Sequence, residues 1–371
     1  MNPTIYLSVV LIFFTLCMSR LLFKKRFKFQ NKNLSVNKFS IVISCRNEAH
    51  NLVHLFDSLQ KLHYSQSLYE IMFIDDHSTD ETFDLLTKFC VKSVNYHAYR
   101  LSGISQGKKF ALQKGISYAQ NDWIVFTDAD CIVHCDWLDS IDFMIQKDKL
   151  NLISMYIGYS PEERLKSISY LVASFRYFKQ LVSAFIYASS TMAGYPFSCT
   201  ARNLIFKKSV FNTVGGYSEF LNADDNLLNK FSGDDKLLLK KFLGHKQKIS
   251  YLPYPPIYTK AVNDNSVKNQ DLRRYGKFSM SSLLWQIIML IIGLCLVYIP
   301  IEIVFIKQSY PELGLFLFSL VFFSFIGCLV HREKFYLEYI IFSIFFPYYL
   351  IYKMIKARFC KWTWKNRRLT I

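Results

Sequence analysis

Two aspartates that flank one alanine, Asp128 and Asp130, directly follow the apolar run "WIVFT" at residues 123–127. Side chains alternate along an extended strand, so both carboxylates can point the same way at its end and share a divalent cation. Mg²⁺ usually takes one or two protein carboxylates and fills its other positions with water and phosphate oxygens. Aspartates also favour turns, because their side chains hydrogen-bond to nearby backbone. Alone, the pair predicts either a turn or a site for a metal and a phosphate.

Two further polar clusters also follow short apolar runs. Arg46, Asn47 and Glu48 come after "FSIVISC", and Asp75 and Asp76 end "YEIMFIDD". The spacing of apolar residues predicts three helices near these runs. They cover 48–62, a capped helix that begins near Thr79, and 108–119. Strands that alternate with helices predict an α/β domain with a mostly parallel sheet covered on both faces. Ligands of such sheets bind outside the carboxyl ends of the strands, so the three clusters should converge where a nucleotide would sit.

Two other stretches carry residues suited to catalysis. Lys108 and Lys109 follow a glycine in "GKKFAL", which fits a solvated helix start or a contact to a diphosphate. Asp234 and Asp235 begin an apolar-periodic run in "SGDDKLLL". Acidic residues in the first turn of a helix complement its macrodipole. The alternative is that this pair supplies a general base, which takes a proton from an attacking hydroxyl.

The composition points to a bilayer. The 371 residues are 51% hydrophobic and 17% aromatic, and the formal charge is +17. Residues 5–18 carry no charge and, with the residues that follow, reach the length of a transmembrane helix within 1–24. The cations come after this run, unlike those of a signal peptide, and place the next residues in the cytoplasm.

The C-terminal part contains more apolar runs. Residues 283–306 and 313–330 are long enough to span a membrane, whereas 339–352 is shorter and contains Pro347. Since a third span would put the basic tail outside, the positive-inside rule favours a re-entrant or interfacial segment there. The apolar stretch 167–190 fits an interfacial helix or a core helix packed under the sheet.

Several partners and sites are excluded or disfavoured. The basic residues cluster beside apolar segments, where they fit anionic lipid headgroups, and no nucleic-acid-binding signature is present. The cysteines are scattered and would face a reducing cytoplasm, so disulfides are not expected. Cys131, His134 and Cys135 look like zinc ligands, but no second ligand pair follows at a suitable spacing.

Six motifs occur in order along the chain, and together they resemble the membrane-bound family 2 glycosyltransferases with the GT-A fold. This family includes ceramide glucosyltransferase-like and polysaccharide synthase-like members. The likeness covers 39 to about 280, roughly two thirds of the chain. The motifs are "IVISCRNEAHNL", "IMFIDDHSTDET", "GKKFALQKGI", "WIVFTDADC", "SCTARNLIFKKSVFNTVGGY" and "SGDDKLLL".

The resemblance implies a role for each matching position. Donor-binding positions are Arg46, Asn47, Glu48, Asp75, Asp76, Lys108, Asp128, Arg202 and Asn203, with Asp75 and Asp76 toward the uracil and ribose and Lys108 toward the diphosphate. Asp128 and Asp130 look like the metal-binding DxD motif, with Asp130 the direct ligand to Mg²⁺ or Mn²⁺. Asp235, next to Asp234, matches the catalytic base.

One motif departs from the pattern of processive synthases. Their Q-x-x-R-W motif corresponds here to "NQDLRRYGKF", in which Gln270 and Arg273 keep the spacing and Arg274 replaces the tryptophan. We place these three residues on the acceptor or diphosphate side. The departure, and the small number of apolar segments, favour transfer of a single sugar over polymer synthesis.

The resemblance implies an inverting, metal-dependent hexosyltransferase of the bacterial inner membrane. It would move sugar from a nucleotide donor, UDP-linked by family habit, to a lipid-linked or membrane-associated acceptor in cell-envelope glycan synthesis. The expected organisation is an N-terminal helix (1–24), a cytoplasmic GT-A domain (38–280), a membrane region (281–356) and a basic tail (357–371). The alternatives are a processive polysaccharide synthase, a non-catalytic sugar-binding membrane protein and a phosphoesterase acting on lipid phosphates.

Overall fold

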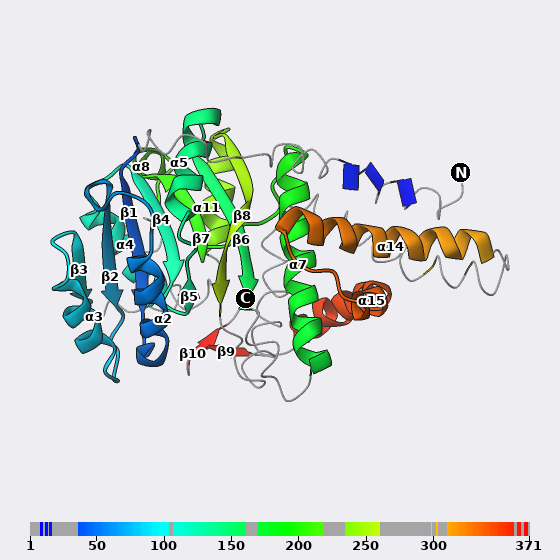
Figure 1. Cartoon of the computed structure of the whole chain (residues 1–371), viewed down its shortest axis with the longest axis horizontal. Helices are drawn as coiled ribbons and strands as arrows, with labels where there is room; N and C mark the ends of the chain where they lie inside the picture. The colour runs from blue at the N-terminus through cyan, green and yellow to red at the C-terminus, as the bar shows by residue number, and fades with distance from the viewer. Residues whose placement is uncertain are drawn as a thin grey trace.

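A computed structural model describes most of the chain (Figure 1). The described residues are 8–9, 12–13, 15–16, 36–103, 107–160, 170–217, 234–259, 298, 302, 310–359, 362–364 and 367–369. Most of the predicted N-terminal span and of the first C-terminal span (283–306) lies outside these residues, as do Gln270, Arg273 and Arg274.

An eight-stranded sheet forms the centre of the domain, in the order β3-β2-β1-β4-β7-β6-β8-β5. Its strands are β1 (Phe39–Cys45), β2 (Tyr69–Asp75), β3 (Tyr96–Arg100), β4 (Trp123–Asp128), β5 (Cys131–Ile132), β6 (Leu152–Tyr159), β7 (Asn203–Lys207) and β8 (Ile249–Thr259). The first four strands in chain order form three parallel pairs, as predicted. β7 runs antiparallel to both β4 and β6, so the sheet is mixed beyond β4.

Helices cover both faces of the sheet because β-strand residues alternate between two apolar cores. One core joins odd-numbered β1 residues such as Ile41 to α2 (Ala49–Gln60), α3 (Thr82–Cys90) and α5 (Trp137–Asp148). The other core joins Val42 to the remaining helices of the domain, α4 (Lys108–Tyr118), α8 (Lys208–Thr213) and α11 (Asp234–Gly244). A short 3-10 helix, η1 (Gln66–Leu68), precedes β2, and two further strands, β9 (Trp362–Trp364) and β10 (Arg367–Leu369), form a separate hairpin.

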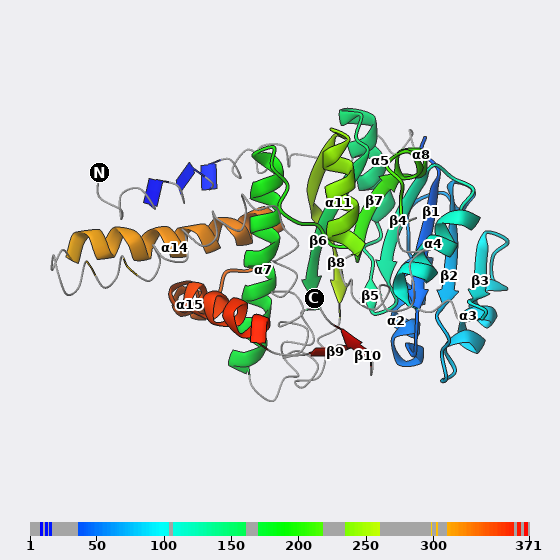
Figure 2. The ribbon, with the colours of Figure 1, turned by 180° about the vertical axis from the view of Figure 1, so that it is seen from behind.

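A long helix, α7 (Tyr170–Met192), stands between the sheet and two apolar helices, α14 (Tyr310–His331) and α15 (Glu338–Phe359), in both views (Figures 1 and 2). One apolar cluster joins α7 to β6, β8 and α14, and a second joins it to α14 and α15. The helix therefore packs against the domain and the apolar helices alike. This agrees with the interpretation of 167–190 as a packed helix, and the interfacial interpretation stays a prediction.

The helices α14 and α15 are long and apolar enough to cross a membrane, with mean hydropathies of 2.6 and 1.2 over their candidate spans. The predicted span 313–330 lies within α14. The shorter run 339–352 is part of α15, which continues through Pro347. Length alone therefore does not favour a re-entrant segment, because the helix extends beyond the apolar run at both ends. The re-entrant or interfacial placement, which depends on the positive-inside rule, stays a prediction.

The start of α3 also differs from the prediction, at Thr82 rather than near Thr79. The backbone amide of Thr79 instead donates to Asn47 Oδ1 at 2.8 Å, which holds it in the loop. Asp80 supplies the local hydrogen bond to the helix, since its carboxylate accepts from the Thr82 amide at 3.0 Å. Because of the hydrogen bonds to the loop after β1, the helix starts about one turn later in the sequence than predicted.

Gly115 sets the distance between α4 and the sheet. A Cβ atom there would lie 2.3 Å from Val42 Cγ1 and 3.2 Å from Ile74 Cγ1, both in the core. We expect Gly115→Ala to destabilise the protein by about 1–3 kcal/mol, because the helix must move outward. Thermal denaturation of the purified protein in detergent measures the effect as a lower Tm.

Gly244→Ala is the matched control, since a Cβ at that helical glycine meets nothing within 4 Å. It should leave Tm unchanged or raise it slightly. Equal Tm values for the two variants would contradict close packing of α4 on β1.

Candidate active site

The carboxyl ends of β1, β2 and β4 lie at one edge of the sheet, which we call the carboxyl edge. The parallel registers pair Cys45 with Asp75 and Ser44 with Asp128. Arg46 follows β1 directly. The structure therefore brings together the three polar clusters that the sequence predicted to converge.

Asp75 is fully buried at this edge, at 0% exposure. Its Oδ2 atom accepts hydrogen bonds from Arg100 Nε at 2.9 Å and from the Ser78 amide at 3.2 Å. Its Oδ1 atom has no hydrogen-bond partner among the residues that the structure describes. A buried acceptor without a donor is costly, so this oxygen is suited to an N–H or O–H group of a ligand.

Asp76 connects three segments of the carboxyl edge. Its Oδ2 lies 3.5 Å from Arg46 Nη1, which also donates to the Asp76 carbonyl at 2.9 Å. Its Oδ1 accepts from the Gly107 amide at 2.9 Å, at the start of α4. Asp76 thereby fixes the turn from which Lys108 projects.

Asn47 and Glu48 help to hold the loop after β2. The Asn47 side-chain oxygen accepts from the backbone amide of Thr79. The backbone amide of Asn47 donates to Ser78 Oγ at 3.0 Å. Asn47 has a positive φ of 52°, which asparagine tolerates better than most residues. The Glu48 amide donates to Thr82 Oγ1 at 2.8 Å. These contacts give Asn47 a clear positioning role.

The centre of the site is an ion pair between Lys108 and Asp128, whose Nζ and Oδ1 atoms are 2.6 Å apart. Desolvation raises the pKa of Asp130, and the charges of Asp128 and Glu48 raise it further. Arg202 and Lys108 lower it in turn. Five predicted site residues therefore act on one another here.

This donor set fits a hard divalent cation. Asp128 and Asp130 offer carboxylate oxygens, the ligands that Mg²⁺ and Mn²⁺ prefer. The raised pKa of Asp130 reflects mutual repulsion and desolvation of carboxylates, which a bound cation would relieve.

The start of α11 lies at the same edge through the segment before β7. Because β7 is antiparallel to β4, Asn203 pairs with Thr127, and the residues just before it reach the carboxyl edge. Cys199 Sγ in this segment contacts the Asp235 carbonyl at 3.2 Å. The helix begins at Asp234, as the sequence predicted, and this contact places its N-terminus beside the segment before β7.

Asn203 has a different environment from the other predicted donor-binding residues. It is fully buried, donates to the Tyr156 carbonyl at 3.0 Å and accepts from Trp137 Nε1 at 3.1 Å. These bonds hold the side chain inside the sheet. We therefore give Asn203 a positioning role for Arg202, in place of the predicted contact to the donor.

Arg100 is a site residue that the sequence reasoning missed. It ends β3, adjacent to Asp75 in the parallel register, and its guanidinium also stacks 4.4 Å from the Phe83 ring centre. No strand was predicted at residues 96–100, so the register that sets Arg100 beside Asp75 could not be anticipated.

Residues 40–211 match the family described as Glycosyl transferase family 2. The chain is 25% identical over 197 residues to a poly-beta-1,6-N-acetyl-D-glucosamine synthase of Staphylococcus epidermidis, covering 53% of this chain and 46% of the relative. It is 29% identical over 117 residues to a beta-monoglucosyldiacylglycerol synthase of Nostoc sp., covering 31% and 25%. The chain thus spans less than half the length of either relative.

A solved structure shares the fold over nearly the whole chain. The mannosyltransferase PcManGT from Pyrobaculum calidifontis, in complex with GDP-Man and Mn²⁺, superposes with a TM-score of 0.52 at 14% identity. The superposition covers 96% of this chain and 98% of that one. Residues 40–211 thus match a glycosyl transferase family 2 domain, and the mixed sheet that they help to build has a GT-A-type fold.

Proposed function

We propose that the protein transfers one sugar, with inversion, from a UDP-linked donor to a lipid-linked acceptor in bacterial cell-envelope synthesis. The observation that carries the proposal is the group of Glu48, Lys108, Asp128, Asp130 and Arg202 at the carboxyl edge. This group combines carboxylates for a metal with cations for a diphosphate. The non-catalytic alternative gives no reason to keep so unfavourable a cluster of charges.

The nucleoside part of the donor would bind beside Asp75. The unpartnered Oδ1 of Asp75 can accept a hydrogen bond from an N–H group of the base, and uracil has such a group. Arg100 and Ser78 hold the other carboxylate oxygen, so the side chain is oriented before the donor arrives. Pre-orientation of this kind reduces the entropic cost of binding.

The diphosphate would lie between Lys108 and Arg202. Mg²⁺ or Mn²⁺ held by Asp128 and Asp130 would act as a Lewis acid on the leaving diphosphate. The Mn²⁺ complex of the structural neighbour supports the metal requirement. Lys108 would turn from Asp128 to a phosphate oxygen, because both partners lie within reach of its flexible side chain.

Asp235 would act as the general base. The acceptor hydroxyl oxygen attacks the anomeric carbon of the donor, and the bond from that carbon to the diphosphate oxygen breaks. The hydroxyl proton passes to the Asp235 carboxylate, and the electron pair of the broken bond leaves with the diphosphate. Attack from the face opposite the leaving group inverts the anomeric configuration.

The acceptor would arrive from the membrane. The N-terminal part of α7 meets the carboxyl edge, where the Tyr177 hydroxyl donates to the Ser160 carbonyl at the end of β6. Near this contact Tyr170, Leu171 and Val172 are 44–60% exposed. Because α7 packs on α14 and α15, this apolar surface would lie at the headgroup level with the domain in the cytoplasm.

A processive polysaccharide synthase is the second candidate. The similarity to the staphylococcal polymer synthases favours it, since the matched stretch covers about half of this chain. Single transfer is supported instead by the glycolipid synthase relative and by Arg274 in place of the motif tryptophan. The size of the product separates the two candidates.

Transfer activity can be tested directly. Membranes that contain the protein are incubated with labelled UDP-glucose, UDP-N-acetylglucosamine, UDP-galactose or GDP-mannose and with Mg²⁺ or Mn²⁺, and lipids are then extracted. We expect one labelled lipid that requires both the metal and Asp130. A long labelled polymer would support the synthase instead, and product that survives Asp130→Ala together with Asp235→Asn would refute the mechanism.

Asp235→Asn should lower kcat by about 10²- to 10⁴-fold, because it removes the base without changing the size of the side chain. Donor KM should change little. The matched control is Asp84→Asn, which removes an exposed first-turn aspartate from α3. Equal activity of the two variants would mean that Asp235 serves only the helix macrodipole.

Asp75→Asn should raise the KM for the donor about 10- to 150-fold, the cost of a hydrogen bond to a charged group, with a smaller effect on kcat. Steady-state kinetics at varied donor concentration measure the change. Tm is recorded in parallel, since Asp75 also pairs with Arg100. An unchanged KM in a folded variant would place the nucleobase elsewhere.

A further inference from the structure

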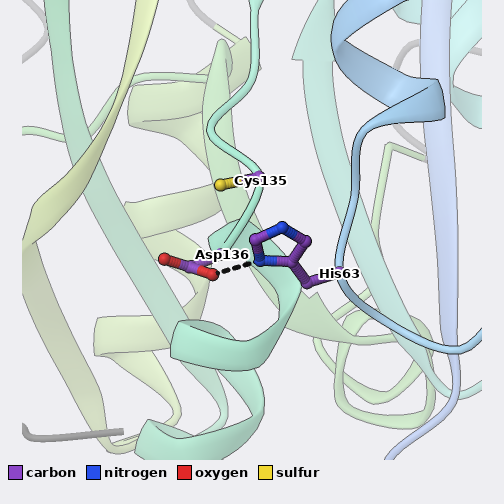
Figure 3. A group of neighbouring side chains, drawn as sticks. All are labelled: His63, Cys135 and Asp136. Atoms are coloured by element: carbon purple, nitrogen blue, oxygen red, sulfur yellow. Dashed lines mark hydrogen bonds and ion pairs between the residues drawn. The ribbon is translucent and has the colours of Figure 1, made fainter.

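A second group of potential metal ligands lies apart from the predicted metal ligands Asp128 and Asp130. Figure 3 shows His63, Cys135 and Asp136 side by side, with the histidine pointing toward the aspartate. One ligand atom from each of the three residues lies within 4.8 Å of the others. His63 Nδ1 and Asp136 Oδ1 are 2.7 Å apart.

The fold holds the two segments of this group together independently of any metal. The His63 amide donates to the Cys135 carbonyl at 2.9 Å, and the Val133 amide donates to Ser58 Oγ at 3.2 Å. These bonds join the end of α2 to the turn before α5. The ligand atoms therefore approach each other on a fixed backbone frame, as a preformed site requires.

We propose that His63, Cys135 and Asp136 bind Zn²⁺ or a similar borderline-soft divalent ion. Thiolate, imidazole and carboxylate are the ligands that zinc takes in proteins, and a fourth position would be open to water. Tetrahedral bond lengths separate neighbouring ligand atoms by about 3.3–3.8 Å. Metal binding would widen the 2.7 Å contact between His63 and Asp136, and Cys135 Sγ, which lies within 4.8 Å of both, would approach the ion by a side-chain rotation.

The sequence pattern alone could not show this site. Cys131, His134 and Cys135 suggested zinc, but the chain carries no second pair at a usual spacing. The structure supplies His63 from 72 positions before Cys135 and adds Asp136 from the helix start. Cys131 is instead buried beside Asp130, and burial raises its pKa well above the usual value.

A metal at this site would stabilise the segment that follows Asp130. Only a few residues separate Asp130 from Cys135, and β5 lies between them. Tying that turn to the end of α2 would limit the movement of the strand that follows the DxD pair. His134 Nδ1, in the same turn, lies 3.8 Å from both Cys135 Sγ and Asp136 Oδ2, so a second imidazole adjoins the group.

Cobalt titration of the full chain in detergent tests the proposal. Thiolate-bound Co²⁺ gives a charge-transfer absorption in the near ultraviolet, which oxygen ligands at Asp128 and Asp130 do not produce. We expect this absorption in the wild-type protein, its loss in Cys135→Ser, and at least about tenfold weaker binding in His63→Ala. Cys90→Ser, at the end of α3, is the control and should behave as wild type.

A second measurement follows stability instead of absorption. Zn²⁺ should raise the Tm of the wild-type protein, because an ion that binds only the folded state stabilises it. Cys135→Ser should show no such rise, while transfer activity with Mg²⁺ persists in both. A wild-type protein without the cobalt–thiolate absorption, or a Cys135→Ser variant that retains it, would overturn the proposal.

Discussion

Acidic side chains gathered at one edge of a sheet repel one another, and the need to offset this repulsion organises the rest of the site. Three of the aspartates meet this need with a close cation from a neighbouring loop or strand. The pairs are Asp75 with Arg100, Asp76 with Arg46, and Asp128 with Lys108. Asp130 differs, because the opposing charge of Arg202 does not prevent a raised pKa.

This imbalance explains why donor and metal should bind together. In the proposed function, a bound diphosphate would attract Lys108 and Arg202 away from the carboxylates, which would then carry uncompensated charge in a poorly solvated place. A divalent cation held by Asp128 and Asp130 would offset that charge. In the proposed complex the ion pair between Lys108 and Asp128 would therefore be replaced by two contacts. Asp128 would bind the metal, and Lys108 would bind a phosphate oxygen.

Much of the fold and the site could be predicted because the signals are local. Strand ends, helix faces and acidic pairs depend on neighbouring residues, so β1, β2, β4 and α4 match their predicted ranges closely. The antiparallel β7 could not be predicted, because strand direction depends on pairing across the sheet. The burial of Asn203 was missed for the same reason, since Trp137 and Tyr156 reach it only in the folded sheet.

The charged turn after α14 shows what else sequence reasoning passes over. The sequence "HREK" at 331–334 gives no sign of a packing role, yet its first three residues contact tyrosines of the sheet. His331 Nε2 accepts from Tyr251, Arg332 stacks on Tyr254 at 4.0 Å, and Glu333 accepts from Tyr156. Since Tyr156 and Tyr251 are buried, these bonds fix the direction of α14 relative to β6 and β8. If α14 spans the membrane as proposed, the same bonds set the height of the carboxyl edge above it, and thus how far a lipid-linked acceptor must extend to reach Asp235.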